Sequence, residues 1–365
     1  MKKYKSIICL ALVAVVFAGM TVSAWVSPTK DFSDSERREL DKFPTLSVST
    51  LLDGTFMSKF ESYTQDQFPL RDTMRTLKAM AVYYLFGQAD NNDIYIKDGY
   101  AAKLEYPLNE DKLDHAASRF EYVYNKFIKN KNANVYLSIV PDKSYYLAND
   151  GGYLAMDYEK LFTTMQDKMD FATYIDITGT LDITDYYKTD THWRQEKLTD
   201  TAATLAGAMG ATLSGEYTQN TLDNPFYGVY YGQASLPMPA ETIYYLTNDT
   251  LDGCIVTNME DGTVGGIYNM DKATGRDPYE MFLSGSVSLI TIENPNATTD
   301  RELVIFRDSF GSSISPLLAE GYAKVTLVDI RYLLPDYVGR FVNFDNCDVL
   351  FLYSTLVLNN SETIQ

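Results

Sequence analysis

The chain has 365 residues, of which 45% are hydrophobic and 22% are charged. This balance is typical of a globular protein with a packed core and excludes a disordered chain. Its 49 acidic residues outnumber its 31 Lys and Arg residues, which gives a formal net charge of −18. The charge argues against nucleic acid and against an anionic membrane surface as partners of the body of the chain, because both are bound through clustered basic residues.

The first 26 residues are typical of an export signal. A basic start, Lys2, Lys3 and Lys5, precedes an apolar run over residues 6–20 and the signal-peptidase pattern Val22-Ser23-Ala24. The apolar stretch can be extended to Val26, close to the roughly 20 residues that span a bilayer. Cleavage and retention as a membrane anchor therefore remain alternatives, and both place the rest of the chain outside the cytoplasm.

The three cysteines exclude a disulfide scaffold. Cys9 lies in the apolar run, which leaves Cys254 and Cys347 in the body of the chain. A single bridge between these two stays open, because spacing alone does not establish disulfide geometry. Without a Cys-x-x-Cys motif or a Cys/His cluster, we expect no metal and no cofactor.

Residues 27–100 are predicted to form a linker and an N-terminal helical segment. A polar linker over 27–41 precedes a helical stretch over 54–86, in which apolar residues recur three and four positions apart. Phe68-Pro69 interrupts this stretch, because proline breaks a helix. Residues 91–100 then predict a short strand pair around the turn residues Asp98-Gly99.

Residues 101–365 are predicted to form one α/β domain with a mainly parallel sheet covered on both faces, because strands alternate with helices. The expected strands are residues 135–140, 172–177, 303–306, 324–328 and 349–353. The expected helices are residues 113–129, 158–169, 195–209, 312–319 and 334–341. Between them, residues 212–296 are rich in Gly, Tyr, Thr and Asn, which predicts a β-rich insertion.

The chain has two histidines. His115 lies on a predicted amphipathic helix and is interpreted as a surface residue. His192 lies in a loop between a strand-like stretch, residues 181–186, and the helix that starts at Gln195. Asp190 stands two positions before it, near enough to orient an imidazole, but on this common spacing alone a structural role carries more weight.

A serine follows the apolar strand over residues 303–306. In Arg307-Asp308-Ser309-Phe310-Gly311, the serine lies on a strand-to-helix turn, where its hydroxyl is beside backbone N–H groups that can stabilise an oxyanion. The alternative is that Ser309 caps the following helix, a frequent role of serine. Without a histidine partner, the cap is the favoured interpretation.

Together, Asp190-Thr191-His192-Trp193 and the later strand with Arg-Asp-Ser-Phe-Gly resemble the DHHW family and the related periplasmic alginate O-acetylation proteins. One position departs from the DHHW pattern: Thr191 replaces its second letter, which is not the catalytic histidine. The resemblance extends over nearly the whole exported chain. Its further motifs are Leu52-Asp53-Gly54-Thr55-Phe56, Asp66-Gln67-Phe68-Pro69-Leu70-Arg71-Asp72, Val140-Pro141-Asp142-Lys143, Phe226-Tyr227-Gly228 and Asp329-Ile330-Arg331-Tyr332.

The resemblance implies a three-layer, SGNH-hydrolase-like sandwich with a Ser-His-Asp triad. Ser309 would be the nucleophile, His192 its general base and Asp190 the orienting acid. Ser309 and His192 are then expected to meet at the carboxyl end of one sheet. The resemblance also suggests accessory residues: Gly311 and the Ser309 amide for an oxyanion, Arg331 and Tyr332 for substrate, Asn359 as the asparagine of SGNH sites, and Trp193 for a sugar or, equally, for the core.

The implied function is O-acetylation of a cell-surface or secreted polysaccharide, with a membrane-bound O-acyltransferase as the source of acetyl groups. The acidic chain favours a neutral glycan over a strongly anionic one. Two alternatives stay open: an acetylesterase with the same triad, and a non-catalytic glycan-binding or scaffold subunit. The insertion, residues 212–296, is expected to pack beside the catalytic face and to supply tyrosine or backbone groups to it.

Overall fold

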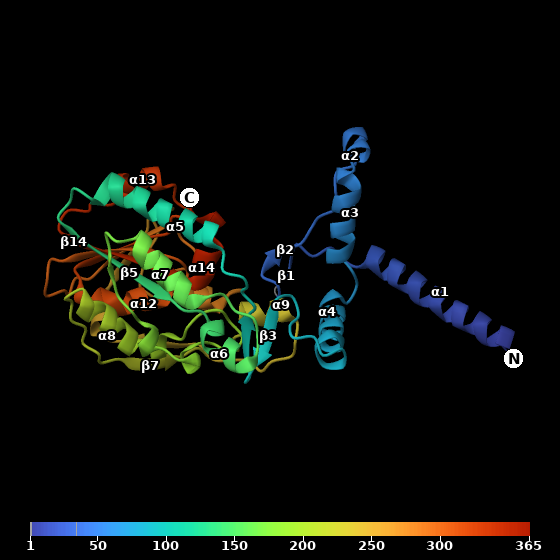
Figure 1. Ribbon diagram of the computed structural model, residues 1–365. Helices are drawn as coiled ribbons and strands as arrows, with labels where there is room; N and C mark the ends of the chain where they lie inside the picture. Colours follow the sequence, from blue (N-terminus) through green and yellow to red (C-terminus); the bar gives the residue numbers. More distant parts are fainter. Residues whose placement is uncertain (1, 34) are drawn as a thin grey trace. The chain divides into compact units, whose positions relative to one another are not determined.

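The computed structural model describes residues 2–33 and 35–365 (Figure 1). Met1, Asp34 and the side chains of Lys2 and Lys3, part of the expected basic start, lie outside this description. The chain divides into two compact units. The first comprises Met1–Asn91 and Tyr231–Pro237, and the second comprises Asn92–Tyr230 and Met238–Gln365.

The N-terminal unit consists mainly of helices. Within the described residues, one helix is long and apolar enough to cross a membrane: α1 (Lys2–Val26), which has a mean hydropathy of 2.5 over Tyr4–Val26. This finding fits a signal peptide and an anchor equally. The elements that follow are β1 (Phe32–Ser33), β2 (Arg38–Glu39), α2 (Val48–Leu52), α3 (Thr55–Asp66), α4 (Arg71–Met80) and the π-helical turn η1 (Ala81–Leu85). The helical stretch over 54–86 is thus interrupted at Phe68-Pro69 as expected.

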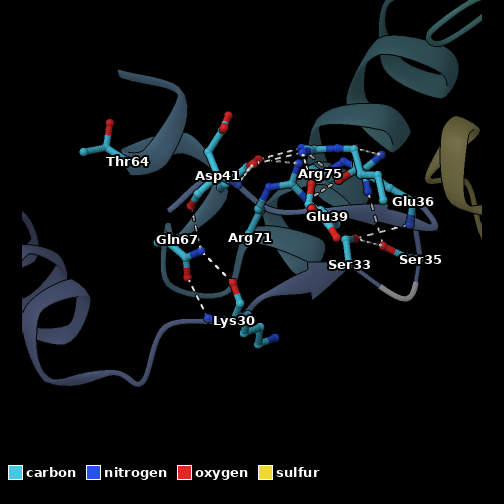
Figure 2. Close-up of polar contacts among 12 residues, drawn as sticks. Lys30, Ser33, Ser35, Glu36, Glu39, Asp41, Thr64, Gln67, Arg71 and Arg75 are labelled. Carbon is cyan, nitrogen blue, oxygen red and sulfur yellow. Dashed lines mark hydrogen bonds and ion pairs between the residues drawn. The ribbon is translucent and has the colours of Figure 1, made fainter. Parts of the chain in front are cut away.

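Polar contacts hold Lys30, Arg38 and Asp41 against the end of α3 (Figure 2). Asp66 accepts hydrogen bonds from both terminal nitrogens of Arg38, at 2.9 and 2.6 Å, and from the Asp41 amide at 2.8 Å. The Gln67 side chain accepts from the Lys30 amide at 2.9 Å and donates to the Lys30 carbonyl at 2.8 Å. The motif that begins at Asp66 therefore fixes the stretch that composition alone describes as a linker.

The second unit is built on a mixed sheet of eight strands within the described residues, in the order β10-β9-β11-β13-β12-β14-β5-β6. From β13 to β6 all neighbours are parallel, and from β10 to β13 all are antiparallel. The strands are β5 (Ala133–Val140), β6 (Thr173–Tyr174), β9 (Ile255–Asn258), β10 (Val264–Gly265), β11 (Leu289–Glu293), β12 (Glu302–Arg307), β13 (Lys324–Val328) and β14 (Cys347–Ser354).

Helices cover both faces of this sheet, which confirms the three-layer α/β architecture. Alternate residues of β12 face opposite cores: Val304 and Phe306 pack in one, and Leu303 and Ile305 in the other. Figure 1 shows α5 and α13 on one side and α8 and α12 on the other. The helices are α5 (Glu110–Val123) with η2 (Tyr124–Ile128), α6 (Lys143–Gly151), α7 (Tyr158–Lys168), α8 (Thr199–Ala208), α12 (Gly311–Leu318), α13 (Pro335–Phe341) and α14 (Thr355–Asn359).

The segment 212–296 is joined to the sheet more closely than an insertion suggests. Its last three strands, β9, β10 and β11, extend the central sheet as an antiparallel edge. Only β7 (Thr218–Thr221) and β8 (Tyr244–Thr247) form a separate pair. Its short helices are α9 (Val229–Ala234), α10 (Asp249–Gly253), α11 (Met270–Ala273) and the 3-10 turn η6 (Pro278–Met281).

The strand-like stretch over residues 181–186 does not form a strand in the described chain. Residues 181–186 form a 3-10 turn, η4 (Ile183–Asp185), and only an isolated bridge joins Tyr186 to Trp193. Asp182 accepts from the Thr184 amide, and Asp185 accepts from the Asp182 amide in return. This reciprocal capping satisfies the backbone locally, so apolar alternation does not produce a strand here.

Three smaller predictions have clear outcomes. The strand pair near residue 98 is present as β3 (Ile94–Lys97) and β4 (Tyr100–Lys103). The helix expected over 195–209 is a 3-10 turn, η5 (Gln195–Lys197), followed by α8. In the described chain Cys254 and Cys347 are buried free thiols, so the disulfide that was possible between them is not formed.

Candidate active site

Ser309, His192 and Asp190 lie in one hydrogen-bonded chain. The Ser309 Oγ lies 2.8 Å from His192 Nε2, and His192 Nδ1 lies 2.6 Å from Asp190 Oδ1. The serine and the histidine are 117 residues apart in the sequence. Asp190 is fully buried and His192 is 8% exposed, so little solvent competes for these contacts. A serine nucleophile requires this order of groups: an imidazole that can accept the Oγ proton, and a carboxylate that faces the other ring nitrogen.

Ser309 is held at the carboxyl end of β12 by its neighbour Asp308. The buried Asp308 carboxylate accepts from the Phe310 amide at 3.0 Å and from the Ser354 amide at 2.8 Å. It thereby joins the turn after β12 to the end of β14. Phe310 is the N-cap residue of α12, with no side-chain capping bond there, so the helix-cap interpretation of Ser309 is not supported.

The two expected oxyanion donors differ in availability. The Gly311 amide already donates to the Asp308 carbonyl at 3.1 Å, within the turn. Across the described residues, no acceptor pairs with the Ser309 amide. Gly311 has a different role, because a Cβ at this position would lie 2.7 Å from Arg307 Cβ. The glycine therefore permits the tight turn, and the Ser309 amide remains the available donor.

Asp190 is oriented from two sides. Its Oδ1 accepts from the His192 amide at 3.0 Å as well as facing the ring, and its Oδ2 accepts from the Val229 amide at 2.8 Å. Gly228 lies so close that a Cβ there would come within 2.3 Å of Asp190 Cα and Cβ. This close approach explains the glycine in Phe226-Tyr227-Gly228, a motif to which the sequence alone assigns no contact.

Tyr279, which the sequence analysis did not single out, stacks on the histidine. Its ring centroid lies 4.0 Å from that of His192, with 10° between the planes, and its hydroxyl donates to Ser313 Oγ at 2.8 Å. Tyr279 comes from η6, inside the segment 212–296. The segment thus supplies a tyrosine that packs against His192, although the ring is buried and does not face an open cleft.

Trp193 is fully buried and its Nε1 lies within hydrogen-bond distance of the Phe310 carbonyl, at 3.1 Å, and Ser313 Oγ, at 2.9 Å. Its alternative role in the core is therefore the one observed, and a sugar has no access to its ring. The indole ties the histidine loop to the start of α12. Trp193 thus helps to hold His192 near Ser309, while its own ring is shielded from solvent.

The remaining sequence candidates do not join the three-residue chain. Arg331 makes two hydrogen bonds to Asp329, at 2.9 and 2.7 Å, and its guanidinium lies 5.4 Å from the ring centroid of Tyr332, whose side chain is exposed. The Asn359 side chain is buried, donates to Glu105 and accepts from the Asn109 amide.

His115, the other histidine, lies on α5 with Nδ1 3.1 Å from Ser361 Oγ. It does not contact Ser309, and it is half-buried rather than fully exposed at the surface.

A buried arginine lies directly before the turn. Arg307 is fully buried and donates to the carbonyls of Gly285 and Val287, at 3.2 and 3.3 Å, and lies 4.0 Å from the Asp329 carboxylate. Burial lowers the pKa of Arg307. These contacts tie the end of β12 to the loop before β11, and they fix the strand from which Ser309 projects.

Among the described residues, no group of three His, Cys, Asp or Glu side chains has the arrangement of a metal site. The site brings together a serine hydroxyl, an imidazole, a carboxylate and the amide of Ser309.

Neither a family model nor a curated protein matches the chain in sequence. Solved structures do match. A DHHW family protein from Eubacterium siraeum has a TM-score of 0.61 and 21% identity, over 75% of this chain and 95% of its own. Bacillus cereus PatB1, solved with a sulfonyl adduct, has a TM-score of 0.57 and 19% identity, over 73% of this chain and 97% of its own. The resemblance in the motifs is thus confirmed at the level of the fold, which this chain shares with a DHHW family protein and with PatB1.

Proposed function

We propose that this protein is an extracytoplasmic serine O-acetyltransferase that modifies a cell-surface or secreted polysaccharide through an acetyl-Ser309 intermediate. The observation that carries the proposal is the hydrogen-bonded chain from Ser309 through His192 to Asp190. In a serine enzyme, the base of such a chain removes the hydroxyl proton, and the carboxylate fixes the tautomer of the base.

The first half-reaction forms the acetyl-enzyme. Ser309 Oγ attacks the carbonyl carbon of the acetyl donor while His192 Nε2 accepts the hydroxyl proton. The negative charge that develops on the carbonyl oxygen is stabilised by the Ser309 amide. The tetrahedral intermediate then collapses, the bond to the donor oxygen breaks, and His192 returns the proton to that oxygen. Asp190 stabilises the imidazolium between these two transfers.

The second half-reaction decides between transfer and hydrolysis. A sugar hydroxyl attacks the acetyl carbon, His192 accepts its proton, and the Ser309 Oγ leaves with that proton as the acetylated sugar forms. Water in place of the sugar gives acetate and makes the protein an acetylesterase. Both outcomes use the same three residues, so acceptor binding alone separates them.

The proposed setting follows from the N-terminal helix and the charge. α1 directs the catalytic unit out of the cytoplasm, whether it is cleaved or kept as an anchor. A membrane-bound O-acyltransferase is the proposed source of acetyl groups on the far side of the membrane. The net charge of −18 favours a neutral glycan as acceptor.

The test is a competition for the acetyl group. The protein is mixed with an activated aryl acetate and with short neutral oligosaccharides, and both acetylated sugar and free acetate are measured. We expect acetylated sugar to appear and to increase with sugar concentration at the expense of acetate. Free acetate alone would make the protein an esterase with these acceptors, and turnover no faster than that of Ser309→Ala would favour the scaffold alternative.

A further inference from the structure

Lys143 is a lysine buried beside the loop that carries Asp190 and His192. It follows β5 as the first residue of α6 and is 2% exposed. Its Nζ donates to the Tyr187 carbonyl at 2.9 Å and to the Lys188 carbonyl at 3.3 Å. The Nζ also lies 4.9 Å from the ring centroid of Tyr230, which is a cation–π distance. Both hydrogen bonds are therefore made to the start of the loop that carries Asp190 and His192.

A carboxylate holds the same loop through the opposite backbone groups. Glu241 accepts from the Lys188 amide at 2.7 Å, and from the amide and hydroxyl of Thr189 at 2.6 and 2.5 Å. The loop is closed at its base, where the Tyr187 amide donates to the His192 carbonyl at 3.0 Å. Lys143 thus donates to the carbonyls of Tyr187 and Lys188, and Glu241 accepts from the amides of Lys188 and Thr189.

We propose that Lys143 is a positioning residue that holds the Asp190–His192 pair in register with Ser309. Through Tyr187 it fixes the residue that pairs with His192, and through Lys188 it fixes the residue two positions before Asp190. This proposal rests on the proposed function for its kinetic consequence, but its structural consequence is independent of catalysis.

Burial and nearby carboxylates have opposite effects on the protonation of Lys143. Burial has the strongest effect and lowers the pKa of Lys143 to about 7, while Asp190, Glu241 and Asp142 each act to raise it. A buried lysine is costly in a fold, and a methionine would fill similar space at lower cost. The structure places this cost at the Tyr187 carbonyl, for which Lys143 is the donor, and beside the Lys188 carbonyl, which also accepts from the Ala101 amide at 2.8 Å.

The test compares Lys143→Met with a matched control in the full chain. Tyr322→Phe also removes one buried hydrogen bond, from the Tyr322 hydroxyl to Asp348, at the opposite end of the strands. We expect Lys143→Met to slow acylation by an aryl acetate by about 10- to 100-fold, the usual effect of a small misplacement of reacting groups, and Tyr322→Phe to change it less than about twofold.

A second readout does not depend on turnover. Because the chain has two histidines, nitrogen-15 histidine labelling gives two imidazole spin systems to resolve by NMR. In the wild type we expect His192 to carry its proton on Nδ1, facing Asp190, with a strongly downfield-shifted proton resonance. We expect Lys143→Met to lose this resonance while His115 is unchanged. If Met is not tolerated, Lys143→Gln keeps a shorter donor without charge and is expected to give a partial loss.

The outcomes separate the two proposals. A wild type that shows the His192 resonance but forms no acetyl-enzyme would contradict the proposed function and leave the positioning role supported if Lys143→Met loses the resonance. A folded Lys143→Met that keeps both the resonance and the wild-type acylation rate would overturn the positioning role.

Discussion

The backbone at Gly228 lies directly against Asp190. A methyl group on residue 228 would come within 2.3 Å of the Cα and Cβ of the aspartate, a distance that real Cβ atoms do not show. The Val229 amide beside it donates to Asp190 Oδ2 at 2.8 Å. The backbone at Gly228 and Val229 therefore packs against the candidate active site, although it lies far from His192 and Ser309 in the sequence.

Gly228→Ala is expected to displace Asp190 and to slow acylation of Ser309 by an aryl acetate by about 100-fold. The matched control is Gly207→Ala in α8, where no atom lies within 4 Å of the added Cβ and alanine favours the helix. The control should keep the wild-type rate and be equally or more stable. A Gly228→Ala protein with the wild-type rate would show that the close contact between residue 228 and Asp190 is not needed for the orientation of Asp190.

Tyr279 should contribute through its ring rather than through its hydroxyl. Tyr279→Leu removes the stacking on His192 and is expected to slow acylation by roughly tenfold, because the imidazole loses a neighbour that restricts its orientation. Tyr279→Phe keeps the ring and loses only the contact with Ser313, so it should stay within about threefold of the wild type. Acylation rates of the two variants, measured at one pH, check this order, and the reverse order would assign the role to the hydroxyl.

The lowered pKa of Lys143 predicts that its contribution to stability increases with pH. Its pKa is about 7 in the folded chain, against its usual value of 10.5. Between these values the unfolded chain binds a proton that the folded chain does not, so the contribution of Lys143 to the free energy of unfolding rises with pH across this window. Below the folded-state pKa that contribution is at its least favourable.

Denaturant unfolding of the wild type and Lys143→Met between about pH 6 and pH 10 measures this contribution. The variant lacks the titration, so its stability relative to the wild type should decline as pH rises through the window between the two pKa values. A constant difference between the two proteins would contradict the lowered pKa.

Asp66 predicts a loss of stability in acid for the N-terminal unit. The Arg38 guanidinium holds the pKa of the Asp66 carboxyl below its usual value. The stability that this carboxylate supplies is thus present above the usual pKa and is lost as pH falls through the lowered one. Asp66→Asn should cost about 1–3 kcal/mol of local stability, because a charged acceptor is lost from a largely buried site.

Hydrogen exchange of residues 30–41 measures this loss. At one pH, faster exchange is expected in Asp66→Asn than in the wild type. As pH falls, the protection factors of these amides in the wild type, taken against the intrinsic exchange rate at each pH, should decrease. Glu61→Gln, on the same helix, changes an exposed side chain whose contact is a 3.4 Å bond from Gln65 and should leave the exchange unchanged. Equal exchange in all three proteins would mean that Asp66 does not hold this segment.

The sequence predicts the fold best where a signal is local. The strands around Leu303 and Val349 are apolar runs bounded by turns, and they occur in the structure as β12 and β14. The three residues of the proposed triad are also within reach of sequence, because Asp190 and His192 are two positions apart and Ser309 follows a strand. Their meeting depends on the parallel sheet, which the alternation of helices and strands predicts.

The sequence fails where the outcome depends on partners distant in the chain. Nothing near Tyr279 indicates that its ring will stack on His192, because the contact is made by tertiary packing of η6. The edge strands β9, β10 and β11 look like part of a separate insertion, since their pairing with β13 is set by the whole sheet. The Gly311 amide is a plausible donor by position, but the turn hydrogen bond to Asp308 already uses it.

The most direct test of the proposed mechanism is to locate the acetyl group. The wild type, Ser309→Ala and His192→Ala are mixed with an activated aryl acetate, and intact mass and peptide mapping follow at short times. One acetyl group on Ser309 is expected in the wild type, none in Ser309→Ala, and formation slower by on the order of 10⁴-fold in His192→Ala. An acetyl group on another residue, or equal labelling of the wild type and Ser309→Ala, would contradict the role of Ser309 as the nucleophile.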